Sequence, residues 1–574
     1  MLHFYFSTTS TEQLTGGKHD VPARMDSSDF VSGASETGSL TAHSNNESQF
    51  VGSSSGVYFI NTVRQAFSKN LDQPGNSSPS GQGFPPPEDT LVGSEDSPRD
   101  KHRDLFSTTA SPSITGGDGP GPESLGCWKY ASTVSAQLGN APPLDMAKEL
   151  MMAYFKVWHP LFPFLHGPTF LQAMELLYSG DSQDPTAVNQ NQPPSHDHSN
   201  VCWTTIFQCV FNLASLLRPD LHLPPGSQID SPSGMYSLLG TLSSRHDLSS
   251  LQALLAAQLY LVAKMSLRTA STVGGCILRS MLHAGLHRCP FRYKELSSHD
   301  RQLRKRIFWC AYAIDRYLSQ ALGLPLGIQD SDVDVCPPGA HEVHFPGTSR
   351  APLSSTGRSQ SRATEPGHLN EGTEDQQRKR ESALASYVES GKLTGRALEL
   401  FHKSIVVRSI RRSSVLFLAS DVHKWWNSLP RDLQGTPYPP AVSSSSTTTT
   451  DKPFNFGPFF TVLYHHLILL INRPFLSLSP STAEFCSALQ TCIGAARGIL
   501  TALRAQVDGG QELFWPGFLS AAWMSGLVLA FACQLRQYVL SKGYQYVTSI
   551  HPSIHPFIHS FIHRYILPGV MTTD

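Results

Sequence analysis

The sequence predicts an all-α fold, because apolar residues recur at helical spacing along most of the chain and no run of alternating apolar residues predicts a strand. Prolines such as Pro219, Pro290 and Pro325 separate the helical patterns. The expected helices cover about 144–158, 168–179, 201–218, 249–268, 272–288, 299–322, 381–429, 455–472, 481–506 and 513–542.

The first expected helix begins near Asp145, a residue type that caps helices, and ends at His159-Pro160, because the residue before a proline disfavours the helical conformation. Pro163 keeps the chain out of a helix, and Pro168 suits the first turn of the next one. Three aromatic side chains are expected to fill the corner: Phe162, Phe164 and Phe170. We interpret this stretch as an apolar turn that locks two helices together. The alternative is an inducer pocket lined by these aromatic residues.

The helix over 299–322 begins with a basic cluster of Arg301, Arg304, Lys305 and Arg306. The cluster is expected to form a solvated face, with Asp300 nearby to balance it. A nuclear-localisation or DNA-phosphate role is the alternative. Later in this helix, adjacent opposite charges at 315 and 316 predict an ion pair that organises helix packing.

Two further patterns resemble functional sites but are interpreted differently. Asp330, Asp332 and Asp334 begin like a calcium loop, yet Val335 and His341 replace the glycine and glutamate that such a loop requires. The uncharged stretch 513–535 is long enough to cross a bilayer, but its Gly, Ser, Gln and Pro residues favour a buried core helix. No nucleotide-binding loop, zinc-protease motif or nucleophile elbow occurs, so we expect no enzyme and no catalytic residue.

Composition divides the chain into helical and polar parts. The polar parts are rich in Ser, Thr, Gly and Pro and bury too little apolar surface to offset the entropy of ordering. The expected order is a disordered region over 1–143, helices over 144–345, a disordered insertion over 346–380, helices over 381–436, a Ser/Thr linker over 437–452, helices over 453–545, and a low-complexity tail over 546–574. Only 57–67 interrupts the first region, as a short apolar segment that can form a transient helix.

The tail repeats Ile-His-Pro-Ser or a close variant, which suggests a microsatellite or a read-through intron. Its four regularly spaced histidines are expected to bind metal at most adventitiously, because Pro552 and Pro556 oppose the helix that would align them.

Charge and cysteine content limit the functional classes. The net charge of −1 and the 16% of charged residues give no basic field for nucleic acid over the whole chain. Ten irregularly spaced cysteines are too few for a disulfide scaffold, and the opening residues lack a signal-peptide pattern. A reducing intracellular location is therefore expected.

Three stretches together resemble a known family. The first reads YFKVWHPLFPFLHGPTF over 154–170. The second runs from GLHR at 285–288 through LRKRIFW at 303–309 and IDR at 314–316 to LGLP at 322–325 and DVD at 332–334. The third has YHHL at 464–467 and NRPF at 472–475. These resemble the fungal-specific transcription factor domain, or middle homology region, of zinc-cluster regulators. The resemblance covers about 145–342 and, more weakly, 385–543.

The resemblance implies a multi-helix regulatory domain in a nuclear protein that controls transcription by RNA polymerase II. The family positions in this sequence are expected to be structural: Pro160, Phe162, Pro163, His166, Phe170, His287, Arg306, Trp309, Asp315, Arg316, Arg473 and Pro474. The implied partners are the transcription machinery or co-regulator proteins and a small-molecule inducer, with no membrane.

Family members usually bind DNA through an N-terminal binuclear zinc cluster held by six closely spaced cysteines. In this sequence no two cysteines lie three apart and none precedes Cys127. DNA binding and zinc are therefore expected only through a cluster upstream of this sequence, and no metal-binding or DNA-binding residue is expected in the chain itself. The alternatives are a DNA-binding-deficient cofactor or decayed relative, and a helical small-molecule-binding protein without a role on DNA.

Overall fold

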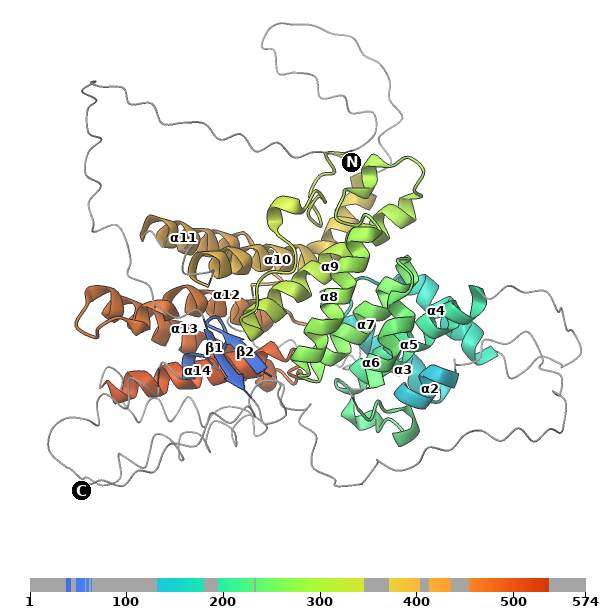
Figure 1. Cartoon of the computed structure of the whole chain (residues 1–574), viewed down its shortest axis with the longest axis horizontal. Helices are drawn as coiled ribbons and strands as arrows, with labels where there is room; N and C mark the ends of the chain where they lie inside the picture. The colour runs from blue at the N-terminus through green and yellow to red at the C-terminus, as the bar shows by residue number, and fades with distance from the viewer. Residues whose placement is uncertain are drawn as a thin grey trace, which may run out of the picture.

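The computed structural model describes residues 38–42, 48–56, 58–60, 63, 132–179, 195–231, 234–344, 371–402, 412–434 and 454–535 (Figure 1). The predictions for the linker over 437–452 and the tail over 546–574 lie outside these residues. The same holds for most of the predicted disordered region 1–143 and for the insertion up to residue 370.

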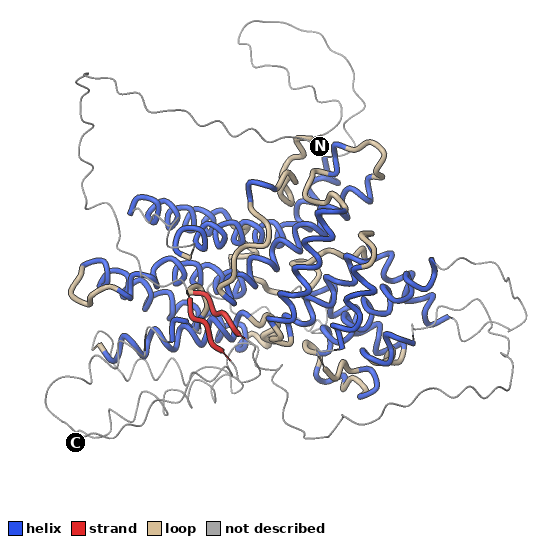
Figure 2. Tube along the Cα trace, in the orientation of Figure 1, coloured by secondary structure: helices blue, strands red, loops and turns tan. Residues whose placement is uncertain are grey.

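The described chain is helical almost throughout, which confirms the predicted fold class (Figure 2). The helices are α2 (Ser132–Leu138), α3 (Leu144–Val157), α4 (Gly167–Ser179), α5 (Ser195–Ser215), α6 (Gly234–Ser243), α7 (Leu248–Ala263), α8 (Leu267–His283), α9 (Ser298–Leu322), α10 (Glu371–Phe401), α11 (Arg412–Ser428), α12 (Gly457–Asn472), α13 (Ala483–Asp508) and α14 (Gly517–Gln534). Short 3₁₀ turns punctuate them, among them η6 (Pro290–Arg292), η7 (Asp330–Asp332) and η8 (Arg473–Ser477).

Local chemistry accounts for several helix ends. Helix α3 ends at Val157, before His159-Pro160, as predicted. Its N-cap is Pro143, so the expectation of an Asp145 cap is wrong, and Asp145 lies in the first turn, where a carboxylate favours the helix dipole. Side-chain caps do begin α7 and α9, where Asp247 accepts from Ser250 N at 2.8 Å and Ser297 accepts from Asp300 N at 3.0 Å.

Helix α9 lies in the middle of the molecule (Figure 1). It packs against α7 and α8 on one side and against α10 on the other, and α12, α13 and α14 pack in series beyond α10. Buried apolar residues from all these helices form one continuous core. Apolar residues of the helices before residue 345 therefore share one core with those of the helices after residue 370.

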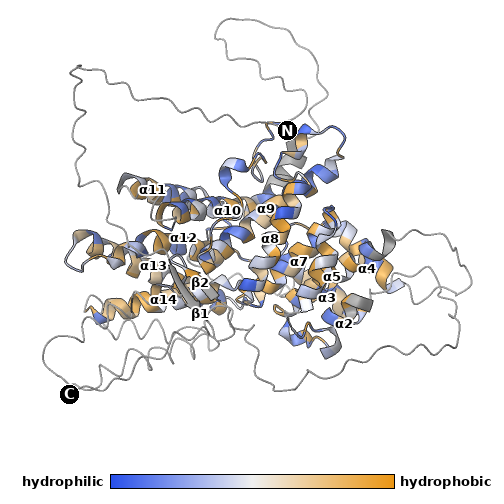
Figure 3. Cartoon of the chain, viewed as in Figure 1, coloured by the Kyte–Doolittle hydropathy of each residue, from blue (hydrophilic) through white to orange (hydrophobic). Residues whose placement is uncertain are grey.

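Three described helical stretches are long and apolar enough to cross a membrane by length and composition: Gly457–Ser477, Ala483–Asp508 and Gly517–Gln534. Their most apolar windows are 61%, 56% and 72% buried inside the protein. Helix α14, coloured mostly as hydrophobic in Figure 3, is the most buried of them. Packing among α12, α13 and α14 accounts for this composition, and α14 lies within the stretch 513–535 that was predicted to be a buried core helix; residues 536–542 of the predicted helix lie outside the described residues.

Part of the region predicted to be disordered is folded. Strands β1 (Gly38–Ala42) and β2 (Ser48–Gly52) form an antiparallel hairpin that the sequence did not predict. The following segment packs on the core, where Phe59, Ile60 and Val63 are 3%, 6% and 4% exposed. Tertiary contacts supply this burial, and local composition does not report them.

Two further boundaries differ from the predictions. Helix α2 lies within 1–143, and α10 begins at Glu371, inside the predicted insertion 346–380. Helix α6 was also missed, because it is short and contains Gly234 and Gly240. In each case the polar or glycine-rich composition hid a helix.

Gly52 at the end of β2 lies against Gly323 at the end of α9, and this contact can be tested with two glycines of similar conformation. Gly323 and Gly285 have φ angles of +71° and +72°. A Cβ on Gly285 meets nothing within 4 Å, whereas one on Gly323 would overlap the backbone of Gly52. Gly285→Ala is expected to cost about 1–2 kcal/mol of stability from left-handed strain alone. Gly323→Ala should cost more in urea unfolding, and equal losses would contradict the docking of β2.

Candidate functional site

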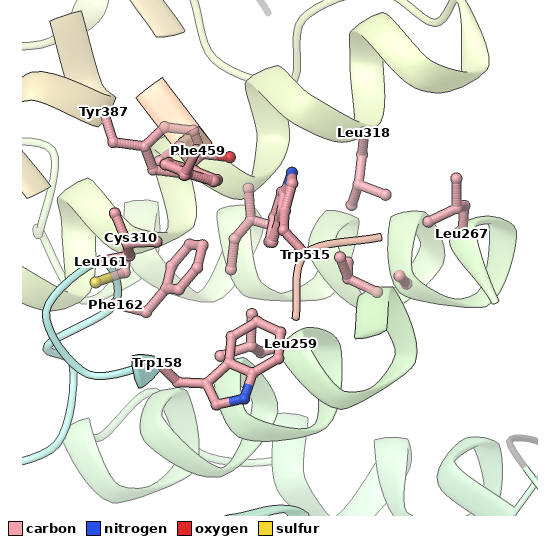
Figure 4. Packing of buried hydrophobic residues seen from close by; sticks show 14 of the residues in the cluster. Trp158, Leu161, Phe162, Leu259, Leu267, Cys310, Leu318, Tyr387, Phe459 and Trp515 are labelled. Carbon is pink, nitrogen blue, oxygen red and sulfur yellow. The ribbon is translucent and has the colours of Figure 1, made fainter. Parts of the chain in front are cut away.

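The turn between α3 and α4 carries the first family motif. His159 Nε2 lies 3.0 Å from the Leu165 carbonyl oxygen, and burial lowers the pKa of His159 to about 4, so the neutral ring donates this bond at neutral pH. Phe162 points into the core, with its ring centre 5.7 Å from those of both Tyr387 and Trp515 (Figure 4). One side chain thus joins the turn to α10 and to the residues before α14.

The other aromatic residues of this motif also face inward. Phe164 and Phe170 are fully buried, and the Phe170 ring lies 5.0 Å from that of Phe207. Edge-to-face and offset ring pairs at such distances add to the stability that burial alone gives. The structure therefore favours the locking turn over a pocket lined by Phe162, Phe164 and Phe170.

The outer side of the same turn borders a groove of about 840 Å³. Its lining residues come from the turn, the start of α9, the start of α10 and the segments near 432 and 454; they include Pro160, Pro163, His166, His299, Arg306, Lys379, Arg380, Glu381 and Asp432. The volume lies within the range of small-molecule sites. Three cations against two carboxylates give the groove a slight positive charge.

Polar contacts fix two of these side chains. His166 Nδ1 lies 2.8 Å from Thr169 Oγ1, and its ring packs edge-on against His299 at 4.5 Å. Burial, reinforced by His299, lowers the pKa of His166. Arg306 Nε donates to the Gln302 carbonyl at 3.4 Å, and burial lowers the pKa of this guanidinium as well. The groove therefore holds a partly desolvated guanidinium beside His159 and His166, two imidazoles whose pKa values are lowered by burial.

A second, internal cavity of about 50 Å³ lies between α9, α10, α12 and Trp515. Tyr317 Oη and Arg316 Nε have no hydrogen-bond partner within the described part of the chain. A space of this size, lined mainly by apolar residues, is too small for a metabolite.

Arg316 is the centre of a buried ionic network, and its side chain is 1% exposed. Its Nη1 lies 2.8 Å from Asp315 Oδ2, while Nη2 lies 2.7 Å from Asp330 Oδ1 and 2.8 Å from the Ile328 carbonyl. The guanidinium also stacks 4.0 Å from the Tyr312 ring centre. This confirms the predicted ion pair and extends it, because the network ties the loop after α9 to the helix itself.

The basic cluster at the start of α9 is not the solvated face that was predicted. Lys305 Nζ lies 2.9 Å from Glu342 Oε2, and the two side chains are 7% and 8% exposed. Arg301 Nε and Arg304 Nη1 donate to the carbonyls of Tyr293 and Ala284 at 3.1 Å each. Lys305 is therefore buried by the loop that carries Glu342, while Arg301 and Arg304 are only partly buried by their carbonyl partners.

His287 and Trp309 hold the loop that follows η7. Trp309 Nε1 donates to the Cys336 carbonyl at 3.0 Å, and Asp334 N donates to the His287 carbonyl at 3.1 Å. Residues 288 and 334 form an isolated parallel β-bridge. These contacts place residues 334–344 against the turn after α8.

Four potential metal ligands meet at this junction: Cys289, Cys336, Glu342 and His344. Their ligand atoms all lie within 4.8 Å of one another. Burial raises the pKa of the Cys289 thiol to about 12. Sequence spacing did not reveal the group, because 46 residues separate the two cysteines and the glutamate and histidine come from a loop.

Arg473 and Pro474 begin η8. Arg473 Nη2 donates to the carbonyls of Ser53 and Ser54 at 3.2 and 2.7 Å, and the guanidinium lies 5.4 Å from the Phe59 ring centre. Burial lowers the pKa of Arg473 to about 10. This arginine therefore fastens the N-terminal segment to the C-terminal helices.

Comparisons with known proteins agree with the motif resemblance. The model of the "Fungal specific transcription factor domain" matches residues 151–356. A protein of Fusarium proliferatum described as "Probable transcription factor FUP6" is 43% identical over 88% of this chain and 72% of its own length. No solved structure matches.

More distant relatives carry related descriptions. The "Transcriptional activator protein acu-15" of Neurospora crassa is 23% identical over 62% of this chain, and "Activator of stress genes 1" of Saccharomyces cerevisiae is 27% identical over 38%. The matches span only 34% and 23% of those two proteins. The family and these descriptions point to transcription regulators rather than enzymes. Because the Fusarium relative matches most of both chains, this chain belongs to the family of fungal transcription regulators that carry the fungal-specific transcription factor domain.

Proposed function

We propose that the chain acts in the nucleus on RNA polymerase II genes, and that the groove beside the 159–168 turn receives a small anionic inducer. DNA contact would come from a binuclear zinc cluster beyond this sequence or from a partner protein. The helical domain would restrain or expose activating surfaces that co-regulators or the transcription machinery recognise.

The groove is the observation that carries this proposal. Arg306 from α9 and Lys379 and Arg380 from α10 line it together, so an anion bound there would neutralise cations on both helices. The same two helices pack around Arg316, since Gly391 and Gly395 of α10 lie against its side chain. A ligand that changes the spacing of α9 and α10 at the groove would therefore affect a rigid contact farther along the pair.

The test joins the full chain to a foreign DNA-binding domain and measures a reporter gene, with a tagged chain followed by microscopy. Nuclear accumulation and changed reporter output are the expected results. A cytosolic chain without effect on the reporter would contradict the regulatory role.

A matched pair of substitutions tests the groove. Arg306→Gln should weaken the response to anionic metabolites by roughly 10-fold or more, because a charge-assisted hydrogen bond is lost. Arg504→Gln is the control, since Arg504 is exposed on α13 and pairs only with Asp508 at 3.4 Å in the described structure. Equal responses of the two variants would place the inducer elsewhere.

A further inference from the structure

The cluster of Cys289, Cys336, Glu342 and His344 has the composition of a metal site. Cys289 follows α8 and the other three residues follow η7, so two separate loops supply the ligands. Cys289 Sγ lies 3.0 Å from Glu342 Oε1, and Cys336 Sγ lies 3.4 Å from His344 Nδ1. His344 Nδ1 and Glu342 Oε1 are 4.0 Å apart.

These separations of 3.0, 3.4 and 4.0 Å lie on both sides of those found around one small ion. Tetrahedral zinc with sulfur at 2.3 Å and nitrogen or oxygen near 2.0–2.2 Å places its ligands roughly 3.3–3.8 Å from one another. Thiolate and imidazole ligands suit zinc, whereas magnesium and calcium prefer oxygen alone. We propose that Cys289, Cys336, Glu342 and His344 bind one Zn²⁺ ion in a closed, four-ligand structural site.

The neighbours of the ligands support this assignment. His344 Nε2, the ring nitrogen away from the cluster, lies 3.6 Å from Asp334 Oδ1. A carboxylate on the second nitrogen orients a metal-bound imidazole and fixes its tautomer. Asp334 is itself held by Arg292 Nη2 at 2.9 Å. Trp309 holds the backbone at Cys336, and the bridge between residues 288 and 334 joins this loop to the one that carries Cys289.

Charge also balances. Binding Zn²⁺ releases the two thiol protons to solvent, and the neutral imidazole adds no charge. Two thiolates and one carboxylate then leave the complex with a charge of −1. The buried Lys305 ammonium, 2.9 Å from Glu342 Oε2, neutralises that remaining charge. The lysine therefore balances the group in both states, pairing with the Glu342 carboxylate alone when no ion is bound.

The site would join the two loops at a point where the apolar core is small. Cys289, Phe291 and Cys336 form a hydrophobic cluster of their own, separate from the main core. This site departs from the expectation that the chain itself binds no metal, and it is distinct from a DNA-binding zinc cluster.

The experiment measures metal in the full chain, purified without a histidine tag and dialysed against a weak chelator. Elemental analysis should find one zinc per chain. Cys289→Ser/Cys336→Ser should lose it, while Cys276→Ser/Cys486→Ser, which removes two cysteines outside the cluster, should keep it. Replacing His551, His555, His559 and His563 with alanine removes adventitious binding by the tail and should also leave the zinc in place.

Cobalt substitution keeps the test decisive if the cysteine variant misfolds. The unaltered chain should show the visible absorption of tetrahedral thiolate-bound Co²⁺, which added Zn²⁺ abolishes. Asp334→Asn should weaken the metal affinity by about 10–100-fold. The proposal is overturned by metal that only the tail variant loses, by a Cys289–Cys336 disulfide in the purified chain, or by cobalt spectra without thiolate bands.

Discussion

Replacing Arg316 with methionine is expected to lower the free energy of unfolding by about 3–5 kcal/mol, because removing one partner leaves buried charge without compensation. The buried carboxylate is Asp315, 14% exposed; Asp330, 47% exposed, would also lose its cation, and the Ile328 carbonyl would lose its donor. The Tyr312 ring would also lose the guanidinium stacked on it. Chemical denaturation followed by circular dichroism measures the loss.

The matched control for this change is Arg396→Met. Arg396 also pairs with an aspartate, Asp421 at 2.7 Å, but both side chains are nearly half exposed. Exposed pairs contribute about 0–1 kcal/mol, so the control should change stability little. Similar losses for the two variants would show that the Arg316 network is not buried in solution.

Phe162→Ala is expected to cost about 3–5 kcal/mol, the usual loss when a buried phenylalanine is truncated and the cavity does not collapse. Phe162 is fully buried and contacts rings from two distant segments, at Tyr387 and Trp515 (Figure 4). The surrounding aromatic rings are held by their own neighbours and cannot easily fill the space. Thermal and urea unfolding should both report the change.

Phe417→Ala provides the comparison, because Phe417 is 69% exposed on α11. Substitutions at exposed positions usually stay within about 0.5 kcal/mol. A small loss at Phe162 would mean that the turn after α3 is not part of the core, and the structural role of the first family motif would then be wrong.

The sequence predicted most of the helices because their apolar residues repeat at helical spacing, a property that local chain geometry dictates. Helix α9 illustrates this: the predicted range 299–322 differs from the observed helix by one residue. The Asp315–Arg316 ion pair was also predictable, because a charged side chain in an apolar helix is costly to bury unless an opposite charge pairs with it. Asp330, by contrast, joins the pair only through the loop that returns after α9.

The remaining features depend on contacts between distant residues. Lys305 resembles any exposed helix cation until Glu342 is brought beside it. The apolar segment over 57–67 predicted only a transient helix, because its sequence does not show that Phe59, Ile60 and Val63 are buried in the core. The Cys289–Cys336 cluster has the same origin. Such sites follow from topology, and single-sequence patterns do not contain it.

The contact between Arg473 and residues 53–54 spans about 420 positions of the chain. Synthesis is vectorial, so this N-terminal segment leaves the ribosome long before its partner arginine exists. Phe59 in this segment lacks the Arg473 side chain on which it packs until the intervening helices have been synthesised. Docking of the segment is therefore a late event in folding, because it requires the part of the chain that carries Arg473.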